Sequence, residues 1–165
     1  LLQKILTVSK LYGNFLLKSG ICSNTYFDKY QFTADPKLLS EIGIELAKLL
    51  PPDTEVIAGL EMGAIPLAVS VSRITGIPSA FIRKERKSYG TCNYAEGASM
   101  IGKKIVIIED IITSGSAVIE ALEKMRYDNL NIIGVVSVID RNSGGREAIE
   151  KFGTLVQSLY TLSEM

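Results

Sequence analysis

The feature that most constrains this chain is a buried strand that runs into an acidic pair, a small polar loop and a helix. Ile105–Ile108 is an uninterrupted β-branched run, which is typical of a strand buried on both faces of a parallel sheet. Glu109 and Asp110 follow it, then Thr113-Ser114-Gly115-Ser116, and an apolar helical pattern begins at Ala117. Because open α/β sheets bind ligands beyond the carboxyl ends of their strands, the sequence predicts a ligand site at this edge.

The loop predicts which ligand binds there. It provides hydroxyl groups, consecutive backbone N–H groups and a glycine directly before a helix, and such helix N-termini bind phosphate. With carboxylates beside it, the stretch predicts a sugar-phosphate site. The alternative is that Glu109 and Asp110 merely end a strand while Thr113 or Ser114 caps the helix. A cap needs one such residue, not an acidic pair and four small residues, so we favour the ligand site.

Length and charge limit the class of protein. A chain of 165 residues suits one domain with a single core, so we expect one domain over residues 1–165. Its 18 Lys and Arg residues balance 18 Asp and Glu residues, so no net field attracts nucleic acid or an anionic membrane as a partner. No apolar stretch reaches the length of a membrane span, and Cys22 and Cys92 lack metal-site spacing. We expect a cytoplasmic protein.

Strand and helix patterns alternate along the chain. Asp35-Pro36 predicts the start of a helix that Pro51 ends, and Gly76 ends the next one. Four strand–helix alternations with polar residues at strand ends predict an α/β fold with a doubly wound, mostly parallel sheet. The apolar spacing predicts helices over residues 2–17, 36–50, 65–75, 117–122 and 147–152, and strands over residues 56–60, 79–82, 105–108, 132–139 and 155–159.

Two nucleotide-binding motifs are excluded. Residues 97–104 nearly spell a P-loop, but Lys104 stands where that motif needs serine or threonine. The glycines also precede a strand, whereas a P-loop follows one. The chain contains no GxGxxG, so a dinucleotide-binding fold has no support from a motif.

The stretch from Val106 to Ser116 resembles the signature of type I phosphoribosyltransferases, which use 5-phosphoribosyl 1-pyrophosphate (PRPP). In that family the acidic pair contacts the ribose hydroxyls and the following loop holds the 5′-phosphate. The resemblance implies a catalytic role for Glu109 and Asp110. It also implies Mg²⁺ as cofactor, held mainly by substrate and water oxygens. The PRPP contacts implied here are Glu109, Asp110, Ile111, Ile112, Thr113, Ser114, Gly115, Ser116 and Ala117.

Segments before and after this stretch resemble the orotate branch of the family. Lys18 lies in an LKSG-like turn, and Tyr26-Phe27 is an aromatic pair before an acidic residue. The resemblance places them in a small N-terminal hood, formed mainly by residues 1–34, that faces the base. Arg141 follows Asp140 at a strand end, where the family's arginine binds the orotate carboxylate; a salt bridge to Asp140 is the alternative. The implied orotate contacts are Lys18, Tyr26, Phe27, Thr113 and Arg141.

Four cations fall within Arg83-Lys84-Glu85-Arg86-Lys87, which on charge alone favours a solvated surface loop. The segment resembles the mobile catalytic loop of orotate phosphoribosyltransferases, about residues 83–97, which closes over pyrophosphate in the neighbouring subunit's site. The resemblance implies a homodimer with shared active sites and a catalytic role for Lys87. The PRPP contacts implied in this loop are Arg83, Lys84, Lys87 and Tyr89.

Two positions depart from the family pattern. Tyr89 stands where many bacterial members have histidine, and Gly63 stands where many have lysine, so the family's contacts at these positions do not carry over directly. The matches nevertheless extend from Lys18 to Arg146. They imply that orotate and PRPP are converted to orotidine 5′-monophosphate and pyrophosphate in the synthesis of UMP. A phosphoribosyltransferase for another base, a PRPP-sensing regulator of the same fold and a structural or interaction domain are the alternatives.

Overall fold

Residues 1–16, 20–84 and 94–162 are described by the computed structural model of the chain. Within them, a six-stranded sheet has the strand order β5-β4-β3-β6-β7-β8. Neighbouring strands pair in parallel, except that β5 is antiparallel to β4. The predicted α/β fold with a doubly wound, mostly parallel sheet is confirmed. The strands are β3 (Val56–Leu60), β4 (Ser79–Ile82), β5 (Ala95–Gly97), β6 (Lys104–Ile112), β7 (Asn131–Asp140) and β8 (Val156–Thr161).

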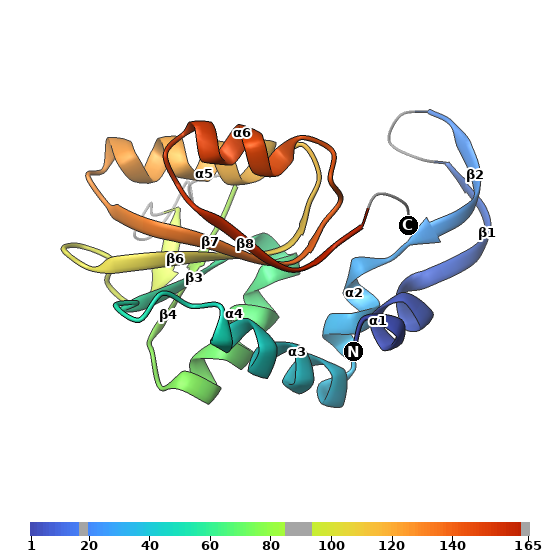
Figure 1. The fold of residues 1–165 in the computed structure, drawn as a ribbon, viewed down its shortest axis with the longest axis horizontal. Helices are drawn as coiled ribbons and strands as arrows, with labels where there is room; N and C mark the ends of the chain where they lie inside the picture. The colour runs from blue at the N-terminus through green and yellow to red at the C-terminus, as the bar shows by residue number, and fades with distance from the viewer. Residues whose placement is uncertain (17–19, 85–93, 163–165) are drawn as a thin grey trace.

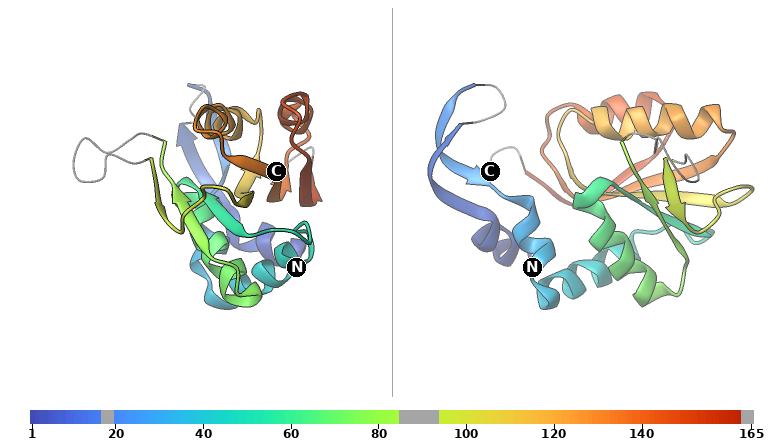
Figure 2. Two further views of the ribbon diagram at one scale, coloured as in Figure 1. Left: turned by 90° about the vertical axis from the view of Figure 1, so that its left-hand side faces the viewer. Right: turned by 180° about the vertical axis from the view of Figure 1, so that it is seen from behind.

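Two layers of helices cover the sheet (Figures 1 and 2). The helices α3 (Pro36–Lys48) and α4 (Glu61–Thr75) lie on one face, and α5 (Ser116–Tyr127) and α6 (Gly145–Lys151) lie on the other. As predicted, the Asp35 side chain caps α3, accepting hydrogen bonds from two backbone N–H groups. Gly76 ends α4 with a φ of 76°, in the left-handed region that favours glycine.

The winding of the chain reverses between β3 and β6. From β3 the chain moves outward to β4, and from β6 it moves in the opposite direction to β7 and β8. In open α/β sheets the ligand crevice lies at such a switch point. The pairing of β3 with β6 ends at Gly59 and Ile108, so the last residues of β6 continue past the end of β3. This step in the sheet edge is where the acidic pair lies.

The prediction of one helix over residues 2–17 is wrong. Helix α1 (Leu2–Ser9) is followed by strand β1 (Lys10–Leu16), which pairs antiparallel with β2 (Cys22–Phe27). The apolar spacing fits a helix, but Gly13 is a poor helix former and the aromatic residues Tyr12 and Phe15 favour a strand. Pairing with β2 decides between the two, and local periodicity does not contain that information.

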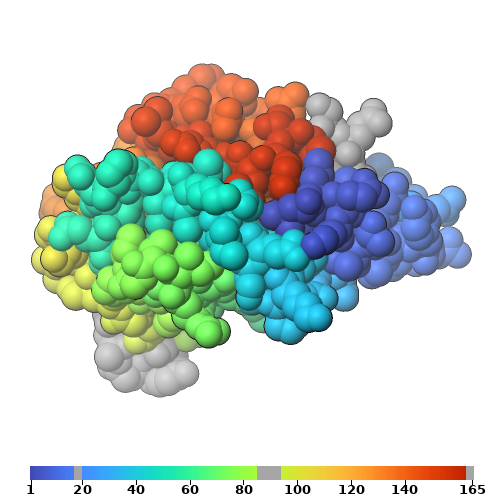
Figure 3. All heavy atoms as spheres, turned by 60° about the horizontal axis from the view of Figure 1, so that its bottom comes forward, coloured from blue at the N-terminus to red at the C-terminus, as the bar shows by residue number. Residues whose placement is uncertain are grey.

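Two helices of the hood, residues 1–34, pack into the core of the sheet domain. Helix α2 (Lys29–Ala34), which the sequence pattern did not predict, is capped by Asp28, whose side chain accepts the Tyr30 N–H. Ile5 of α1 and Phe32 of α2 are fully buried and belong to the same core as β6. Burying such a side chain contributes about 1.5–3 kcal/mol. Strands β1 and β2 project beyond this core, as the blue residues of Figure 3 show.

Among the described residues, no helix combines the length and the apolar character that crossing a bilayer requires.

Candidate active site

The acidic pair is buried at the end of β6, with 7% of Glu109 and 1% of Asp110 exposed. Both carboxylate oxygens of Asp110 have contacts with neighbouring groups. Lys29 Nζ of α2 lies 2.8 Å from Oδ2 and 3.1 Å from Oδ1, and the Ile111 N–H donates to Oδ1 at 2.6 Å. Burial lowers the pKa of Lys29, but the charge and hydrogen bond of Asp110, with Glu109, outweigh it and leave that pKa raised. The ion pair fixes the orientation of the carboxylate.

Each carboxylate of the pair has one oxygen that accepts no hydrogen bond from the described residues, Glu109 Oε2 and Asp110 Oδ2. Oδ2 still has its ion-pair contact with Lys29, whereas no ion pair is recorded for Glu109 among these residues. Burial, together with the charge of Asp110, raises the pKa of Glu109 well above its ordinary value of 4.5, and the charge of Lys29 opposes this. Its Oε2 atom accepts no hydrogen bond from the described residues. A buried polar atom left unpaired costs about 1–3 kcal/mol, so a ligand hydroxyl that donates to Oε2 recovers that energy.

Gly63, in the first turn of α4, touches the acidic pair. A Cβ atom at this position would lie 1.7 Å from Asp110 Oδ2 and 3.1 Å from Lys29 Nζ. The carboxylate and the ammonium group therefore occupy the space that any side chain at position 63 needs. This contact favours glycine at position 63 in the present arrangement of Asp110 and Lys29.

The loop before α5 has the form of an anion site. Thr113, Ser114 and Ser116 are exposed, whereas Gly115 is buried and lies at the N-cap of α5 with a φ of 73°. The helix has no side-chain cap, and the contact from the Ser116 N–H to Ser114 Oγ is long at 3.5 Å. Of the alternative in which Thr113 or Ser114 caps the helix, the structure therefore retains this one long contact of Ser114. The first N–H groups of α5 face an exposed surface, where an anion can accept from them.

A second glycine, Gly145, packs against the backbone of this loop. A Cβ atom on Gly145, the first residue of α6, would lie 2.2 Å from the Thr113 carbonyl oxygen and 2.8 Å from the Gly115 nitrogen. In the other direction, a Cβ atom on Gly115 would lie 2.8 Å from the Gly145 carbonyl oxygen. The two backbones touch because neither residue has a side chain, and this contact sets the shape of the loop.

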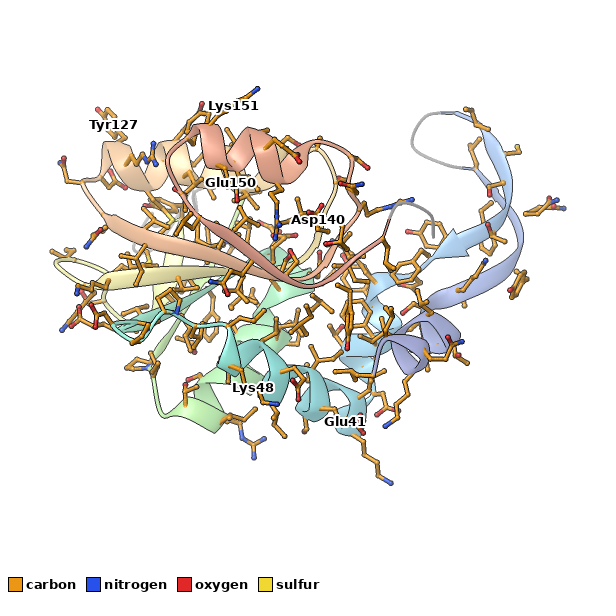
Figure 4. All side chains as sticks on the ribbon, in the orientation of Figure 1. Glu41, Lys48, Tyr127, Asp140, Glu150 and Lys151 are labelled. Carbon is orange, nitrogen blue, oxygen red and sulfur yellow. The ribbon has the colours of Figure 1, made fainter. Side chains whose placement is uncertain are left out.

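Arg141 lies beside the same loop, since its backbone N–H donates to the Ile112 carbonyl oxygen at 2.9 Å. Asp140, labelled in Figure 4, is buried at the end of β7. Its carboxylate lies 3.6 Å from Arg146 Nε and accepts the Asn142 N–H at 2.9 Å. The alternative of an Arg141–Asp140 salt bridge is not formed. Within the described ranges no side chain pairs with the Arg141 guanidinium, so it is available for an anionic ligand.

The aromatic pair of the hood is divided between the two faces of β2. Successive strand residues point to opposite sides, and accordingly Tyr26 is exposed while Phe27 packs against the core. The ring of Tyr26 lies near that of Phe15, with 5.4 Å between centroids. Tyr26 is therefore the member of the pair with a free ring face. Lys18 lies outside the described residues.

The first residues of the predicted basic loop are held in place. The Lys84 N–H donates to the Glu61 carboxylate, and the Lys84 carbonyl oxygen accepts from Lys124 Nζ at 2.7 Å. Glu61 adopts a φ of 58°, which is uncommon for a residue with a side chain. Lys87 and Tyr89 lie outside the described residues.

A cavity of about 220 Å³ lies between these residues and α5. It brings together expected PRPP contacts from two separate segments, Arg83 and Lys84 on one side and Ser116 and Ala117 on the other. The cavity also contains Lys124. The lining thus combines the cations Arg83, Lys84 and Lys124 with the carboxylates Glu61 and Glu120, the latter paired with Lys124.

Three residues of this site were missed from the sequence. Lys29 follows the aromatic pair and a capping aspartate, but no motif marks it as a partner of Asp110. Gly145 belongs to the Gly144-Gly145 turn, which shows the need for small residues without showing what they touch. Lys124 has the ordinary pattern of a surface helix residue paired with Glu120 four positions earlier.

Comparisons with known proteins agree with this geometry. The model of the phosphoribosyl transferase domain family matches residues 51–158. An orotate phosphoribosyltransferase of a Nocardioides species is 41% identical over 158 residues, covering 96% of this chain and 88% of that protein. The orotate phosphoribosyltransferase of Methanocella arvoryzae is also 41% identical, over 154 residues that cover 93% of this chain and 88% of that protein.

Solved structures give the same result. The orotate phosphoribosyltransferase of Mycobacterium tuberculosis in complex with Fe(III) dicitrate has a TM-score of 0.88 and 28% identity, covering 98% of this chain and 94% of that one. The same enzyme in complex with PRPP has a TM-score of 0.83 and 26% identity, covering 98% and 93% of the two chains. Family model, relatives and structures coincide over most of the chain, which therefore belongs to the orotate phosphoribosyltransferases of the phosphoribosyl transferase domain family.

Proposed function

We propose that this chain transfers the phosphoribosyl group of PRPP to orotate, giving orotidine 5′-monophosphate and pyrophosphate in pyrimidine biosynthesis. The observation that carries the proposal is the buried acidic pair beside the N-terminus of α5 at the switch point of the sheet. In this pair Glu109 Oε2 accepts no hydrogen bond from the described residues. Relatives that are 41% identical over the aligned residues are named orotate phosphoribosyltransferase. The likeness to a relative crystallised with PRPP also supports it.

PRPP lies, in this proposal, with its 5′-phosphate on the loop from Thr113 to Ala117 and its ribose hydroxyls on Glu109 and Asp110. The exposed hydroxyls and the N–H groups of the first turn of α5 suit the phosphate. The unpaired Oε2 of Glu109 suits a ribose hydroxyl. Ile111 and Ile112, at the end of β6, provide the backbone between the two subsites.

The pyrophosphate end is assigned to the basic residues. Arg83 and Lys84 line the cavity next to α5, and we assign further contacts to Lys87 and Tyr89. We propose that Lys87 acts in the site of a partner subunit, so that the enzyme is a homodimer. The neutral overall charge makes such local cations the source of attraction for the substrate.

Orotate is assigned to the space between the hood and the end of β7. The unpaired guanidinium of Arg141 suits the orotate carboxylate, because its planar fork donates two parallel hydrogen bonds. Tyr26 offers an aromatic face, and Lys18 and Thr113 complete the set. Phe27 packs against the core, so its contribution is to fix the strand that carries Tyr26.

Mg²⁺ fits this site as an ion carried by the substrate. The acidic pair offers two carboxylate oxygens that accept no hydrogen bond from the described residues, Glu109 Oε2 and Asp110 Oδ2. A hard cation that keeps water and substrate oxygens suits such a site. Glu109 and Asp110 are the residues that would hold it through the ribose hydroxyls. When bound, Mg²⁺ neutralises charge on the pyrophosphate.

The reaction requires the protein to position the two substrates and to stabilise the charges that develop in the transition state. When pyrophosphate leaves, positive charge grows on the ribose and negative charge on the leaving group, so cations at the pyrophosphate end stabilise the transition state. The chain contains no histidine, and the orotate nitrogen can react as an anion, so no general base is required. The hood excludes water that would compete with orotate. We propose that residues 1–165 act as one domain in the cytoplasm.

A panel of bases tests the choice of substrate. The purified protein is given PRPP and Mg²⁺ with orotate, uracil, adenine or hypoxanthine, and the nucleotide formed is measured by chromatography. Orotate should react with a kcat/KM at least a hundredfold above that of the other bases, because a site built for a carboxylate rejects bases that lack one. Equal use of uracil would assign the chain to another base.

A further inference from the structure

The ion pair between Lys29 and Asp110 joins two parts of the protein that are 81 positions apart in the sequence. Lys29 lies in the first turn of α2, directly after the hood strand β2, and Asp110 lies at the end of β6. The ammonium group contacts both carboxylate oxygens, at 2.8 and 3.1 Å. Asp110 is 1% exposed, whereas 38% of the Lys29 side chain remains exposed. The pair thus joins a buried carboxylate to a lysine that solvent still reaches.

Two further contacts hold α2 besides this ion pair. Phe32, one turn along α2, is fully buried in the core. Asp28 caps the helix and also accepts a hydrogen bond from Gln31. Two anchors therefore fix the helix independently of Lys29. The charge of Lys29 serves the acidic pair rather than the helix.

The charge matters because the site takes an anion. Two adjacent buried carboxylates repel a ligand that carries a phosphate and a pyrophosphate, and the ammonium group of Lys29 cancels one of the two charges. Within the described ranges, the ionisable groups that face Glu109 are Asp110 on its own strand and Lys29 on α2. The residue that α4 places against this pair is Gly63, which has no charge and leaves the space that Lys29 fills.

We infer that Lys29 is a positioning residue for PRPP: it orients the Asp110 carboxylate for the ribose hydroxyls and lowers the negative charge of the subsite. The inference rests on the proposed function, because it takes PRPP as the ligand of the acidic pair. It assigns a residue of the hood to the sugar site, in addition to the hood's contacts with the base. Lys29 acts through Asp110 rather than on the reacting atoms.

The inference predicts a change in pH dependence that a structural role does not produce. The positive charge of Lys29 opposes the rise in the pKa of Glu109. Removing that charge raises this pKa further, so the carboxylate ionises only at higher pH. The acid limb of the profile of kcat/KM for PRPP should therefore move to higher pH.

The test compares Lys29→Met, Lys29→Arg and the control Lys37→Met, which removes an exposed lysine from the first turn of α3. Calorimetry with PRPP and Mg²⁺, and steady-state kinetics from pH 5 to 9, are measured for each. Lys29→Met should weaken PRPP binding about ten- to a hundredfold, since charged hydrogen bonds are lost. The KM for orotate should change less than about threefold. Lys29→Arg should recover most of the affinity, and Lys37→Met should match the wild type.

If Lys29→Met does not fold, Lys29→Gln replaces it, with the same loss and the same shift of the acid limb expected. PRPP affinity and an acid limb equal to those of the Lys37→Met control would overturn the inference. A wild-type protein that binds no PRPP and consumes no orotate would contradict the proposed function instead. The two failures are therefore distinguishable.

Discussion

The Asp110 carboxylate fills the space that a side chain at Gly63 would need: a Cβ atom on the glycine would lie 1.7 Å from Oδ2 of the aspartate. The Asp110 carboxylate has little freedom to move, because it is 1% exposed, is paired with Lys29 and accepts a hydrogen bond from the Ile111 N–H. The first turn of α4 and the end of β6 are thus fitted to each other at the switch point of the sheet. A substitution at Gly63 or at Asp110 should therefore change the affinity for PRPP.

Gly63→Ala tests this fit. Alanine is the better helix former by about 1 kcal/mol, so helix content should be retained, while the new methyl group displaces the Asp110 carboxylate. PRPP affinity should fall at least about tenfold. The control is Gly134→Ala, where a Cβ atom meets its nearest neighbour at an ordinary 3.6 Å. Calorimetry and circular dichroism measure both effects, and wild-type affinity in Gly63→Ala would show that the carboxylate position is unimportant.

Glu109→Gln should stabilise the protein and destroy its ligand site. The folded pKa of Glu109 is raised above 4.5, so the folded state binds more protons than the unfolded state once the pH exceeds 4.5. The stability that Glu109 contributes is therefore fully present below that pH and is lost as the pH rises through the raised pKa. Glutamine removes this loss. Urea unfolding from pH 4 to 8 should give a flatter profile for the variant, with PRPP affinity reduced; an unchanged slope would contradict the raised pKa.

Arg141→Ala should separate the two substrates. The change removes the partner of the orotate carboxylate and leaves the phosphate loop intact, so kcat/KM for orotate should fall about ten- to a hundredfold. The affinity for PRPP, measured by calorimetry, should stay within about twofold. Arg73→Ala, which removes an exposed arginine from the last turn of α4, is the control. Equal losses for both substrates would mean that Arg141 does not distinguish them.

Gly115→Ala should damage the phosphate loop in two ways. The φ of 73° strains any residue with a Cβ atom by roughly 1–2 kcal/mol, and the new atom also meets the Gly145 carbonyl oxygen at 2.8 Å. Gly76→Ala is the matched control, because its φ is 76° and nothing lies within 4 Å. Both variants should lose stability in thermal unfolding, but PRPP affinity should fall for Gly115→Ala alone. Equal affinities would place the phosphate elsewhere.

Lys87 and Asp110 test whether the site is shared between subunits. Lys87→Ala should lower kcat about 10²–10³-fold, as loss of a charge partner of the transition state does, and Asp110→Asn should inactivate the sugar site of its own subunit. Mixed dimers of the two variants contain one site with both defects and one with neither. They should recover about half of the wild-type activity per heterodimer. Heterodimers confirmed by native mass spectrometry that stay inactive would contradict a contribution in trans.

The parts of the fold that the sequence predicts are those fixed by neighbours along the chain. The β-branched run of β6, the small residues before α5 and the Asp35 cap of α3 depend on contacts within a few residues. The helix predicted over residues 2–17 was wrong because β1 depends on a partner strand. The Lys29–Asp110 pair could not be predicted, since two ordinary charges far apart in the chain carry no sign of meeting. The separation of Tyr26 from Phe27 follows from strand alternation, once the strand is known.

The central claim is that PRPP and orotate react in this site, and one measurement tests it most directly. Orotate consumed and orotidine 5′-monophosphate formed are quantified together for the wild type, with and without PRPP and Mg²⁺, and for Asp110→Asn under the same conditions. The claim predicts equal amounts of orotate lost and nucleotide gained, only when both PRPP and Mg²⁺ are present, and a strong reduction in the variant. Tight PRPP binding with no nucleotide formed would contradict the claim and leave a PRPP-binding protein without this activity.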